Sequence, residues 1–385
     1  MAADRVAVVA ASVVTALGAD LPATYRALVE GQGAIAPVRG FDASAFGEPV
    51  AAQLPVVLAA ADDGPTRVRT PHGRLLDLCA RRGHEEARFE ALARDAVGLF
   101  AALPVVDSEP RALAAAIVAS RSPAGALDLG AFFSTGFRAI HPLWPLEMLN
   151  NVALGQTAAD LDVRGDNTVV SSEADAGVRA VADAAGAVRR GELSGAIAVG
   201  VADHVSVGAL ARARLRAIPG ETLGEGGGAL ALELESAARA RGVVPRAFLA
   251  GAGFAFERSP FGPGPSSDAI SRAALAALAE AGRSTADVAL LLVEGTGVEE
   301  ASARRALFGT RGAAVAVVAP AMAIGHLRAG APVVGAALAC AILATGTTPS
   351  TAHGRPRRVP TSGVALVLAS GSGGQAAALV VEGVA

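Results

Sequence analysis

Hydrophobic runs alternate with amphipathic stretches along most of the chain, and this alternation predicts an α/β protein. In the first half, short apolar runs predict strands at 5–10, 112–120 and 195–204. Apolar positions that recur every three or four residues predict helices at 21–31 and 85–103. Between them, residues 168–193 predict a buried strand, a sharp turn and a long alanine-rich helix.

The second half of the chain repeats this order of elements. Its predicted elements are a strand at 244–256, a helix at 266–284, a strand at 287–297, a strand, turn and helix at 313–346, and two strands around a glycine-rich turn at 363–383. Because the 313–346 unit resembles the 168–193 unit, we expect an internal duplication, with halves at 1–240 and 241–385. The two copies would bring their helix N-termini together. We therefore expect a site between the halves, formed by both strand-to-helix turns and the turn at 293–297.

The turn at 171–177, with the sequence SSEADAG, is the first candidate for chemistry. A strand that runs into a helix N-terminus suits a nucleophile, because the free N–H groups and the helix dipole stabilise an anion there. This turn has no cysteine and carries two carboxylates, Glu173 and Asp175. Either the turn has lost its nucleophile or a different residue serves.

Composition excludes several classes of function. The chain has 385 residues, of which 52% are hydrophobic, so it can bury a large core. The net charge is −3, every basic residue is arginine, and one Trp and one Tyr are available for stacking, so nucleic-acid binding is not expected. Six scattered histidines and two distant cysteines, Cys79 and Cys340, form no ligand spacing, and we expect neither a metal nor a cofactor.

The cysteines and the N-terminal sequence indicate where in the cell the protein is found. Two lone cysteines suit a reducing compartment, and the N-terminus shows no signal-peptide order, so we expect a cytoplasmic protein. The uncharged stretch Ala329–Thr345 is short, rich in Ala and Gly, and interrupted by Pro332. These features predict a buried core helix rather than a membrane span. Two glycine-rich stretches, 223–235 and 371–375, are expected to be a tight turn leading into a strand and a hairpin turn.

Five motifs spread along the chain carry a resemblance to a known family. They are RVAVVAASVVTALGADLPATYRALVEGQGAIAPVRGFDASAFG at the start, NNVALGQTAADLDVRGDNTVVSS, AGAVRRGELSGAIAVGVADH, LGEGGGALALELESAARARG, and AIGHLRAGAPVVGAALACAILATGTTPST. In this order they resemble a β-ketoacyl synthase of the thiolase superfamily. The resemblance implies a thiolase-like five-layer α-β-α-β-α fold built from two duplicated halves.

The resemblance also implies four catalytic positions, three of which have changed. The position of the family's nucleophilic cysteine is Ala174, and the histidine that opens the family's HGTG turn is replaced by Glu294. The family lysine is replaced by Ala321, while the second histidine survives as His326. The family's GFGG turn, whose phenylalanine gates the acyl pocket, reads GSGG at 371–374.

These changes remove the chemistry of condensation. Ala174 has no atom that could accept an acyl group. Loss of one donor to a developing oxyanion typically costs about 10²–10³ in rate. If Glu294 is ionised, it would repel malonate and its enolate by about 4 kcal/mol at about 4 Å. We therefore expect no catalytic residue at Ala174, Glu294, Ala321 or His326.

The resemblance implies a chain-length factor, a noncatalytic ketosynthase-like subunit that pairs with an active β-ketoacyl synthase. Such a subunit shapes the acyl-chain tunnel in type II polyketide, polyene or fatty-acid-like biosynthesis, and an acyl carrier protein serves the complex. We expect no activity from this chain alone. Its cavity-lining residues are expected to be Ser172, Glu173, Asp175, Met322 and Ser372.

Three other interpretations remain open at this point. Ser172, His326 and Glu294 imitate a Ser-His-Glu triad for acyl transfer or hydrolysis, although Glu294 and His326 could instead be a compensating buried pair. A decarboxylase would need both family histidines. A scaffold could meet an acidic carrier protein through arginines such as Arg212, Arg214 and Arg216. A chain-length factor should have an open apolar tunnel that reaches its partner, whereas a scaffold should have a filled core.

Overall fold

A ten-stranded mixed sheet forms the centre of the fold. The computed structural model describes residues 4–55, 70–105, 110–216, 218, 221–295, 297–350 and 355–384. The strands of the sheet are β1 (Val6–Thr15), β4 (Val97–Leu103), β5 (Asn167–Ser171), β6 (Gly195–Val201), β8 (Gly226–Leu234), β9 (Ala247–Phe256), β10 (Val288–Leu292), β11 (Ala316–Val318), β12 (Val364–Ser370) and β13 (Gln375–Gly383). Their spatial order is β11-β10-β12-β13-β9-β1-β8-β6-β4-β5.

The two halves of this sheet have the same topology. From the outer edge to the centre, the first half has the order β5-β4-β6-β8-β1 and the second half has the order β11-β10-β12-β13-β9. If the five strands of each half are numbered 1 to 5 along the chain, both orders are 3-2-4-5-1. The halves join where Val6–Val8 of β1 pairs antiparallel with residues 247–249 of β9. This repetition confirms the predicted internal duplication. The boundary between residues 240 and 241 stays a prediction.

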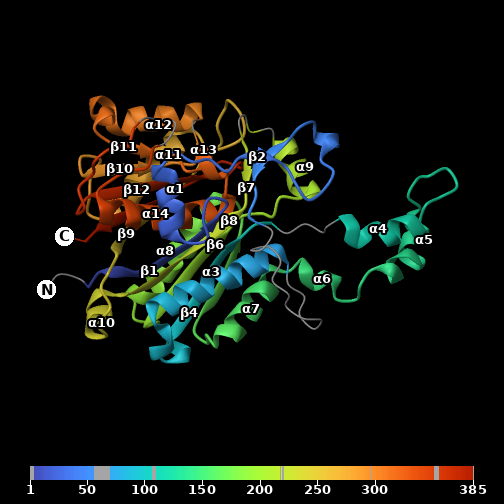
Figure 1. Cartoon of the computed structure of the whole chain (residues 1–385), viewed down its shortest axis with the longest axis horizontal. Helices are drawn as coiled ribbons and strands as arrows, with labels where there is room; N and C mark the ends of the chain where they lie inside the picture. Colours follow the sequence, from blue (N-terminus) through green and yellow to red (C-terminus); the bar gives the residue numbers. More distant parts are fainter. Residues whose placement is uncertain are drawn as a thin grey trace.

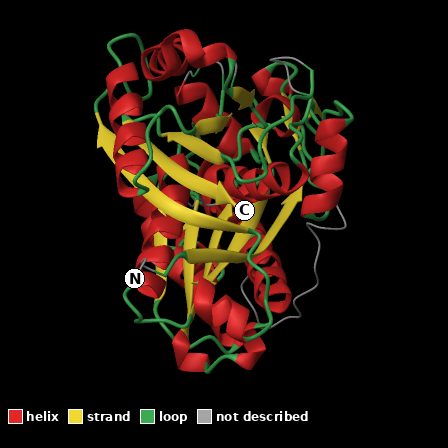
Figure 2. Ribbon diagram, turned by 90° about the vertical axis from the view of Figure 1, so that its left-hand side faces the viewer, coloured by secondary structure: helices red, strands yellow, loops and turns green. Residues whose placement is uncertain are grey.

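Helices divide the fold into five layers (Figures 1 and 2). The helices are α8 (Ala174–Arg189) and α14 (Ala331–Thr345) in the middle, α3 (Pro71–Ala87) and α7 (Asn150–Leu161) on one outer face, and α11 (Ser267–Glu280) and α12 (Val298–Phe308) on the other. The middle layer packs in one buried cluster with strands from both halves, and each outer pair has its own cluster. The predicted thiolase-like arrangement is confirmed.

The two central helices approach each other closely at their N-terminal ends. A Cβ atom on Gly177 of α8 would lie 2.4 Å from the carbonyl oxygen of Ala329, so only glycine allows this contact. The two strand-to-helix turns therefore meet, as the duplication predicts. α14 contributes a run of buried residues, including Cys340. The stretch Arg328–Thr345 is apolar enough to cross a membrane by composition, but 72% of it is buried inside the fold, which agrees with a core helix.

A smaller sheet lies beside one end of the large one. It contains β2 (Ala36–Pro37), β3 (Val50–Ala52) and β7 (Leu223–Gly224), and α9 (Val207–Arg216) lies beside it (Figure 1). The buried carboxylate of Glu225 accepts hydrogen bonds from the N–H groups of Leu54 (2.7 Å) and Val205 (2.8 Å), which joins these segments. The glycine-rich stretch 223–235 thus leads through β7 into β8, as predicted.

Three short helices form an arm that stands away from the body (Figure 1). They are α4 (Pro110–Ala119), α5 (Leu129–Ser134) and α6 (Trp144–Glu147), and they lie between β4 and α7 in the chain. We call residues 110–149 the arm. The remaining α-helices are α1 (Leu21–Val29), α10 (Glu235–Ala240) and α13 (Ala321–Ile324), and the 3₁₀ helices are η1 (Ser44–Phe46), η2 (Phe89–Ala91), η3 (Arg94–Ala96), η4 (Gly136–Ala139), η5 (Gly309–Ala313) and η6 (Arg328–Gly330).

Three sequence predictions in the first half are wrong. The segment 112–120 lies in helix α4 rather than a strand, because its alanines favour a helix over the short Ile-Val pair. The predicted helix 85–103 ends at Ala87, and its last seven residues are β4, whose parallel neighbours bury both faces and remove any alternation. The strand β5 was predicted to be buried, but it is half-exposed, because it is the last strand of the sheet.

Candidate degenerate active site

The first strand-to-helix turn holds Ala174 and two carboxylates. Ala174 is the first residue of α8 and is 1% exposed. The hydroxyl of Ser172 donates a hydrogen bond to Asp175 Oδ1 at 3.0 Å. Burial raises the pKa of Asp175, while this bond from Ser172 opposes the shift. Ser172 is therefore held as a turn residue within its own segment.

The second turn positions His326. Its backbone N–H donates to the carbonyl of Thr222 at 2.7 Å, and Gly224 N–H donates back to the carbonyl of His326 at 3.2 Å, which ties the turn to β7. Burial lowers the pKa of the imidazole to about 4, and the charge of Arg328 acts in the same direction. The ring is therefore neutral at neutral pH.

Glu294 follows β10, and its Oε1 atom is buried, although the residue as a whole is only partly buried. Burial raises its pKa well above the usual range, and the charge of Arg328 only partly opposes this. This shift favours the neutral form of the carboxyl and so opposes the repulsion expected for an ionised Glu294. Within the described parts of the chain, no hydrogen bond or ion pair joins Glu294 to His326, so the buried pair that the sequence left open as an alternative is not formed. Thr296 of the same turn lies outside the described residues.

A second carboxyl lies beside the same turn and was missed by sequence reasoning. Glu300 of α12 accepts a hydrogen bond from Gly295 N–H at 3.4 Å. Burial raises the pKa of this carboxyl to about 8, against the opposing effects of that bond and of Arg304. Two carboxyl groups whose pKa values are raised by burial therefore lie in the region where the resemblance places a family imidazole.

Three of the four family positions line one small cavity. Glu294, Ala321 and His326 surround a space of about 30 Å³, whose other walls are mostly apolar. This volume holds about one water molecule and no acyl chain. Ala174 is not among the residues that line it.

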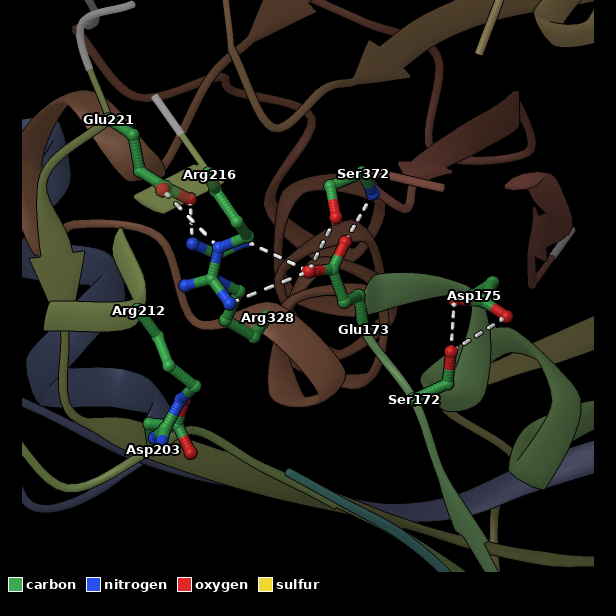
Figure 3. Close-up of polar contacts among 9 residues, drawn as sticks. All are labelled: Ser172, Glu173, Asp175, Asp203, Arg212, Arg216, Glu221, Arg328 and Ser372. Atoms are coloured by element: carbon green, nitrogen blue, oxygen red, sulfur yellow. Dashed lines mark hydrogen bonds and ion pairs between the residues drawn. The ribbon is translucent and has the colours of Figure 1, made fainter. Parts of the chain in front are cut away.

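Four charged residues contact one another between the two turns (Figure 3). Glu173 Oε1 lies 3.6 Å from Arg216 Nη1 and 3.5 Å from Arg328 Nη1. Glu221 contacts both arginines in turn, with its Oε2 atom 3.9 Å from Arg216 Nε and its Oε1 atom against Arg328 Nη2. We call Glu173, Arg216, Glu221 and Arg328 the charge ring.

Ser372 fastens the glycine-rich turn at 371–374 to the charge ring. Its backbone N–H donates to Glu173 Oε2, and its hydroxyl donates to Glu173 Oε1 at 2.9 Å. The predicted cavity-lining residues Ser172, Glu173, Asp175 and Ser372 therefore belong to a polar cluster rather than to the small cavity. Met322 lies on α13 and is 48% exposed.

Two arginines of α9 face inward. Arg216 contacts the charge ring, and Arg212 Nη2 lies 3.5 Å from Asp203 Oδ2. Burial raises the pKa of Asp203 to about 6, against the charges of Arg328 and Arg216. These two arginines therefore support the interior of the site rather than a carrier-binding surface.

The third arginine of α9 lies at the surface. Arg214 is exposed and donates to the carbonyl of Ala45 at 3.4 Å. Sequence reasoning singled out Arg216 only as a surface charge and missed Glu221 and Arg328. The sequence gives no signal for these two residues, because the charge ring joins segments that are far apart in the chain.

The described residues offer no metal site. No group of three or more His, Cys, Asp or Glu side chains in the described ranges is placed to hold a metal ion. Cys79 and Cys340 are both free and buried, and burial raises the pKa of each thiol to about 12. Neither thiol can replace the missing nucleophile.

Comparison with known proteins identifies the family of the chain. Residues 3–238 match the profile of the "Beta-ketoacyl synthase, N-terminal domain", and residues 246–355 match the "Beta-ketoacyl synthase, C-terminal domain". The chain is 30% identical over 407 aligned positions to the "Granaticin polyketide putative beta-ketoacyl synthase 2" of Streptomyces violaceoruber, covering 92% of this chain and 87% of that one. It is 31% identical over 295 positions to a "Putative polyketide beta-ketoacyl synthase 2" of Streptomyces coelicolor, covering 67% of this chain and 68% of that one.

Solved structures share the fold at lower identity. "The ishigamide ketosynthase/chain length factor" superposes with a TM-score of 0.83 and 21% identity, covering 100% of both chains. A structure described as "AntDE:AntF (apo): type II PKS acyl-carrier protein in complex with its ketosynthase bound to the hexaketide" gives a TM-score of 0.82 and 16% identity, covering 99% of this chain and 100% of that one.

Proposed function

The chain belongs to the β-ketoacyl synthase family, and we propose that it is a noncatalytic, chain-length-factor-like subunit of that family. One observation carries this proposal. The family's nucleophile position is a buried alanine, Ala174, and the cavity beside His326 holds about one water molecule. A chain with this site can neither form an acyl-enzyme nor hold an acyl chain there.

The geometry also argues against a repurposed hydrolase. In a Ser-His-Glu triad the serine hydroxyl must hydrogen bond to the histidine. Here the Ser172 hydroxyl donates to Asp175 at 3.0 Å, and His326 and Glu294 share no hydrogen bond in the described part of the chain. These residues therefore give no support for acyl transfer or hydrolysis by this chain.

The arm supplies the main support for a partner subunit. Its exposed large apolar residues are Val118, Leu127, Leu129, Phe133, Phe137, Leu143, Leu146, Met148 and Leu149. An apolar surface concentrated on short helices that stand off the body is typical of a protein–protein interface. An open hollow of about 820 Å³ lies among them, lined by aromatic residues that include Phe132, Phe137 and Trp144.

The edge strand β5 adds a second possible contact. It ends the ten-stranded sheet, so one side of its backbone has no neighbouring strand in the part of the chain that the structure describes. A strand edge of this kind can pair with a strand of another chain. Because β5 leads into α8 and the arm leads into α7, which packs against β5, both surfaces belong to one end of the fold.

The partner in this proposal is an active ketosynthase that keeps its cysteine and both histidines. The acyl chain grows on that partner, and this chain forms part of the tunnel wall with the apolar hollow of its arm. The cavity beside His326 is not the open tunnel expected of a chain-length factor, so the support for a tunnel-forming subunit over a simple scaffold comes from this hollow on the arm. An acyl carrier protein would deliver substrates to the complex, and we expect the complex in the cytoplasm.

Reconstitution of the complex tests this function. The chain is combined with a candidate ketosynthase from its own host, a carrier protein and malonyl thioester, and product length is measured by mass spectrometry. His326→Ala in this chain should leave product formation nearly unchanged, while replacement of the partner's cysteine should abolish it. Loss of all product with a folded His326→Ala variant would contradict the noncatalytic role.

A further inference from the structure

We propose that the charge ring seals the chamber of this chain, defined as the space between Ala174 and the cavity beside His326, against acyl-pantetheine thioesters. The four ring residues come from separate elements. Glu173 lies at the N-terminus of α8, Arg216 ends α9, Glu221 precedes β7, and Arg328 lies in η6 before α14. The ring thus connects both strand-to-helix turns.

Charges alternate around the ring, so each carboxylate contacts two guanidinium groups. The formal charges of the four side chains cancel. Such an arrangement pairs charges that would be costly to bury alone, although ring atoms such as Arg216 Nη2 and Arg328 Nε have no hydrogen-bond partner among the described residues. Two members are deeply buried, since the side chains of Glu221 and Arg328 are 4% and 9% exposed.

The backbone conformation of Arg328 indicates that the contacts of the ring hold this residue in a defined position. Arg328 has a φ of 50°, in the left-handed region that residues other than glycine rarely adopt. This conformation persists where surrounding contacts hold it. The two carboxylates of the ring, Glu173 and Glu221, contact the guanidinium of Arg328 at different nitrogen atoms.

The ring is also joined to the turn that corresponds to the family's gate. Ser372 donates two hydrogen bonds to Glu173, and its carbonyl accepts one from Gly264 N–H at 3.0 Å. Movement of this turn away from α8 would break both bonds to Glu173. An entering thioester would have to separate these contacts and then find a cavity of only about 30 Å³ behind them.

A sealed chamber bears on the growing acyl chain only if the proposed function holds. The acyl chain is then confined to the partner and to the outer surface of this chain, where the arm carries its apolar hollow. The sealing itself is a property of this chain alone. The sealing proposal can therefore be wrong while the chain still pairs with a ketosynthase. The sealing proposal can also be right if the chain does not pair with one.

A cysteine placed at the nucleophile position reports whether the chamber is open. Ala174→Cys is made in the full chain and treated with a chloroacetamide derivative of pantetheine. Where the reagent can enter, the cysteine thiolate attacks the carbon that bears chlorine, a sulfur–carbon bond forms, and chloride leaves. Modification is followed by intact mass spectrometry, with Ala276→Cys as the reference because Ala276 is exposed on α11.

With the ring intact, the cysteine at position 174 should react at least about tenfold more slowly than the one at position 276, because reaction requires local opening. Adding Glu173→Ala and Arg216→Ala should raise the rate by about tenfold or more. That pair of changes keeps the net charge and leaves the contact between Arg328 and Glu221. The matched control is Arg189→Ala with Glu280→Ala, which removes an exposed ion pair of 2.9 Å and should leave the rate unchanged.

Circular dichroism tests whether each variant is folded. If the variant with both Glu173→Ala and Arg216→Ala does not fold, Arg216→Ala alone is used to open the ring. Equal reactivity at positions 174 and 276 with the ring intact would overturn the proposal. So would an unchanged rate at position 174 after the ring is opened in a folded variant.

Discussion

Glu173 accepts two hydrogen bonds from Ser372, one from its backbone N–H and one from its hydroxyl at 2.9 Å, although the two residues are 199 positions apart. This contact joins the N-terminus of α8, in the first half, to the β12–β13 turn in the second. It lies beside Ala174 and within the GSGG turn, the positions that the resemblance assigns to a nucleophile and a gating phenylalanine. The contact holds these two turns together.

Arg328 should be essential for stability. Arg328→Met keeps much of the side-chain volume but leaves Glu173 and Glu221 without one of their partners. Because breaking a buried ion pair leaves an uncompensated charge, we expect a loss of about 3–5 kcal/mol in the free energy of unfolding. Urea denaturation measures it, and Arg189→Met, at an exposed ion pair, is the matched control. A loss as small as that of the control would show that the ring is not stabilising.

Stability should fall under mildly acidic conditions because of His326. The pKa is about 4 in the folded chain, below the ordinary value of 6.5, so the unfolded chain binds a proton that the folded chain does not. Stability from this group is present above pH 6.5 and declines as the pH falls towards 4, by up to about 3 kcal/mol. His326→Leu should flatten this part of the curve in denaturation measured between these two pH values. An unchanged slope would contradict a buried, neutral imidazole.

Glu300 should act in the opposite direction. Its pKa of about 8 lies above the ordinary value of 4.5, so the folded chain keeps a proton that the unfolded chain has lost. Stability from this group is present below pH 4.5 and is lost as the pH rises through 8, by up to about 5 kcal/mol. Glu300→Gln, which keeps the acceptor for Gly295 N–H, should remove this decline. If the variant and the parent lose stability in parallel across this range in urea denaturation, the carboxyl is not protonated in the fold.

Phe133 should be required for assembly and not for folding. It is 70% exposed on α5, so Phe133→Asp should leave the thermal midpoint of the isolated chain nearly unchanged. A charge at an apolar interface leaves a desolvated group without a partner, so binding to a ketosynthase should weaken by about tenfold or more. Analytical ultracentrifugation of mixtures measures this. Val244→Asp, at another exposed apolar residue (72%), is the control. Equal binding by both variants would exclude the arm from the interface.

Sequence patterns predict the second half of the fold better than the first. From residue 244 onward each predicted strand and helix is found, because each run is bounded by glycine or polar residues, but helix α12 (Val298–Phe308) was not predicted. The arm is harder to predict, since alanine-rich runs around Ile117 carry no clear period. β4 is mistaken for a helix because a strand buried on both faces shows no alternation.

The degenerate site is only partly predictable. The changed positions Ala174, Glu294 and Ala321 follow from motif register alone. The upward shift in the pKa of Glu294 depends on its burial, which no motif encodes. The charge ring depends on the tertiary fold, because Glu221 and Arg328 meet only when the two turns are brought together.

The proposed role of this chain is that of the noncatalytic member of a heterodimer. Native mass spectrometry of the tagged chain, purified from its own host, tests this role most directly. We expect a 1:1 complex with a second ketosynthase that keeps its cysteine and both histidines. A homodimer or a monomer alone, with no ketosynthase bound, would contradict it.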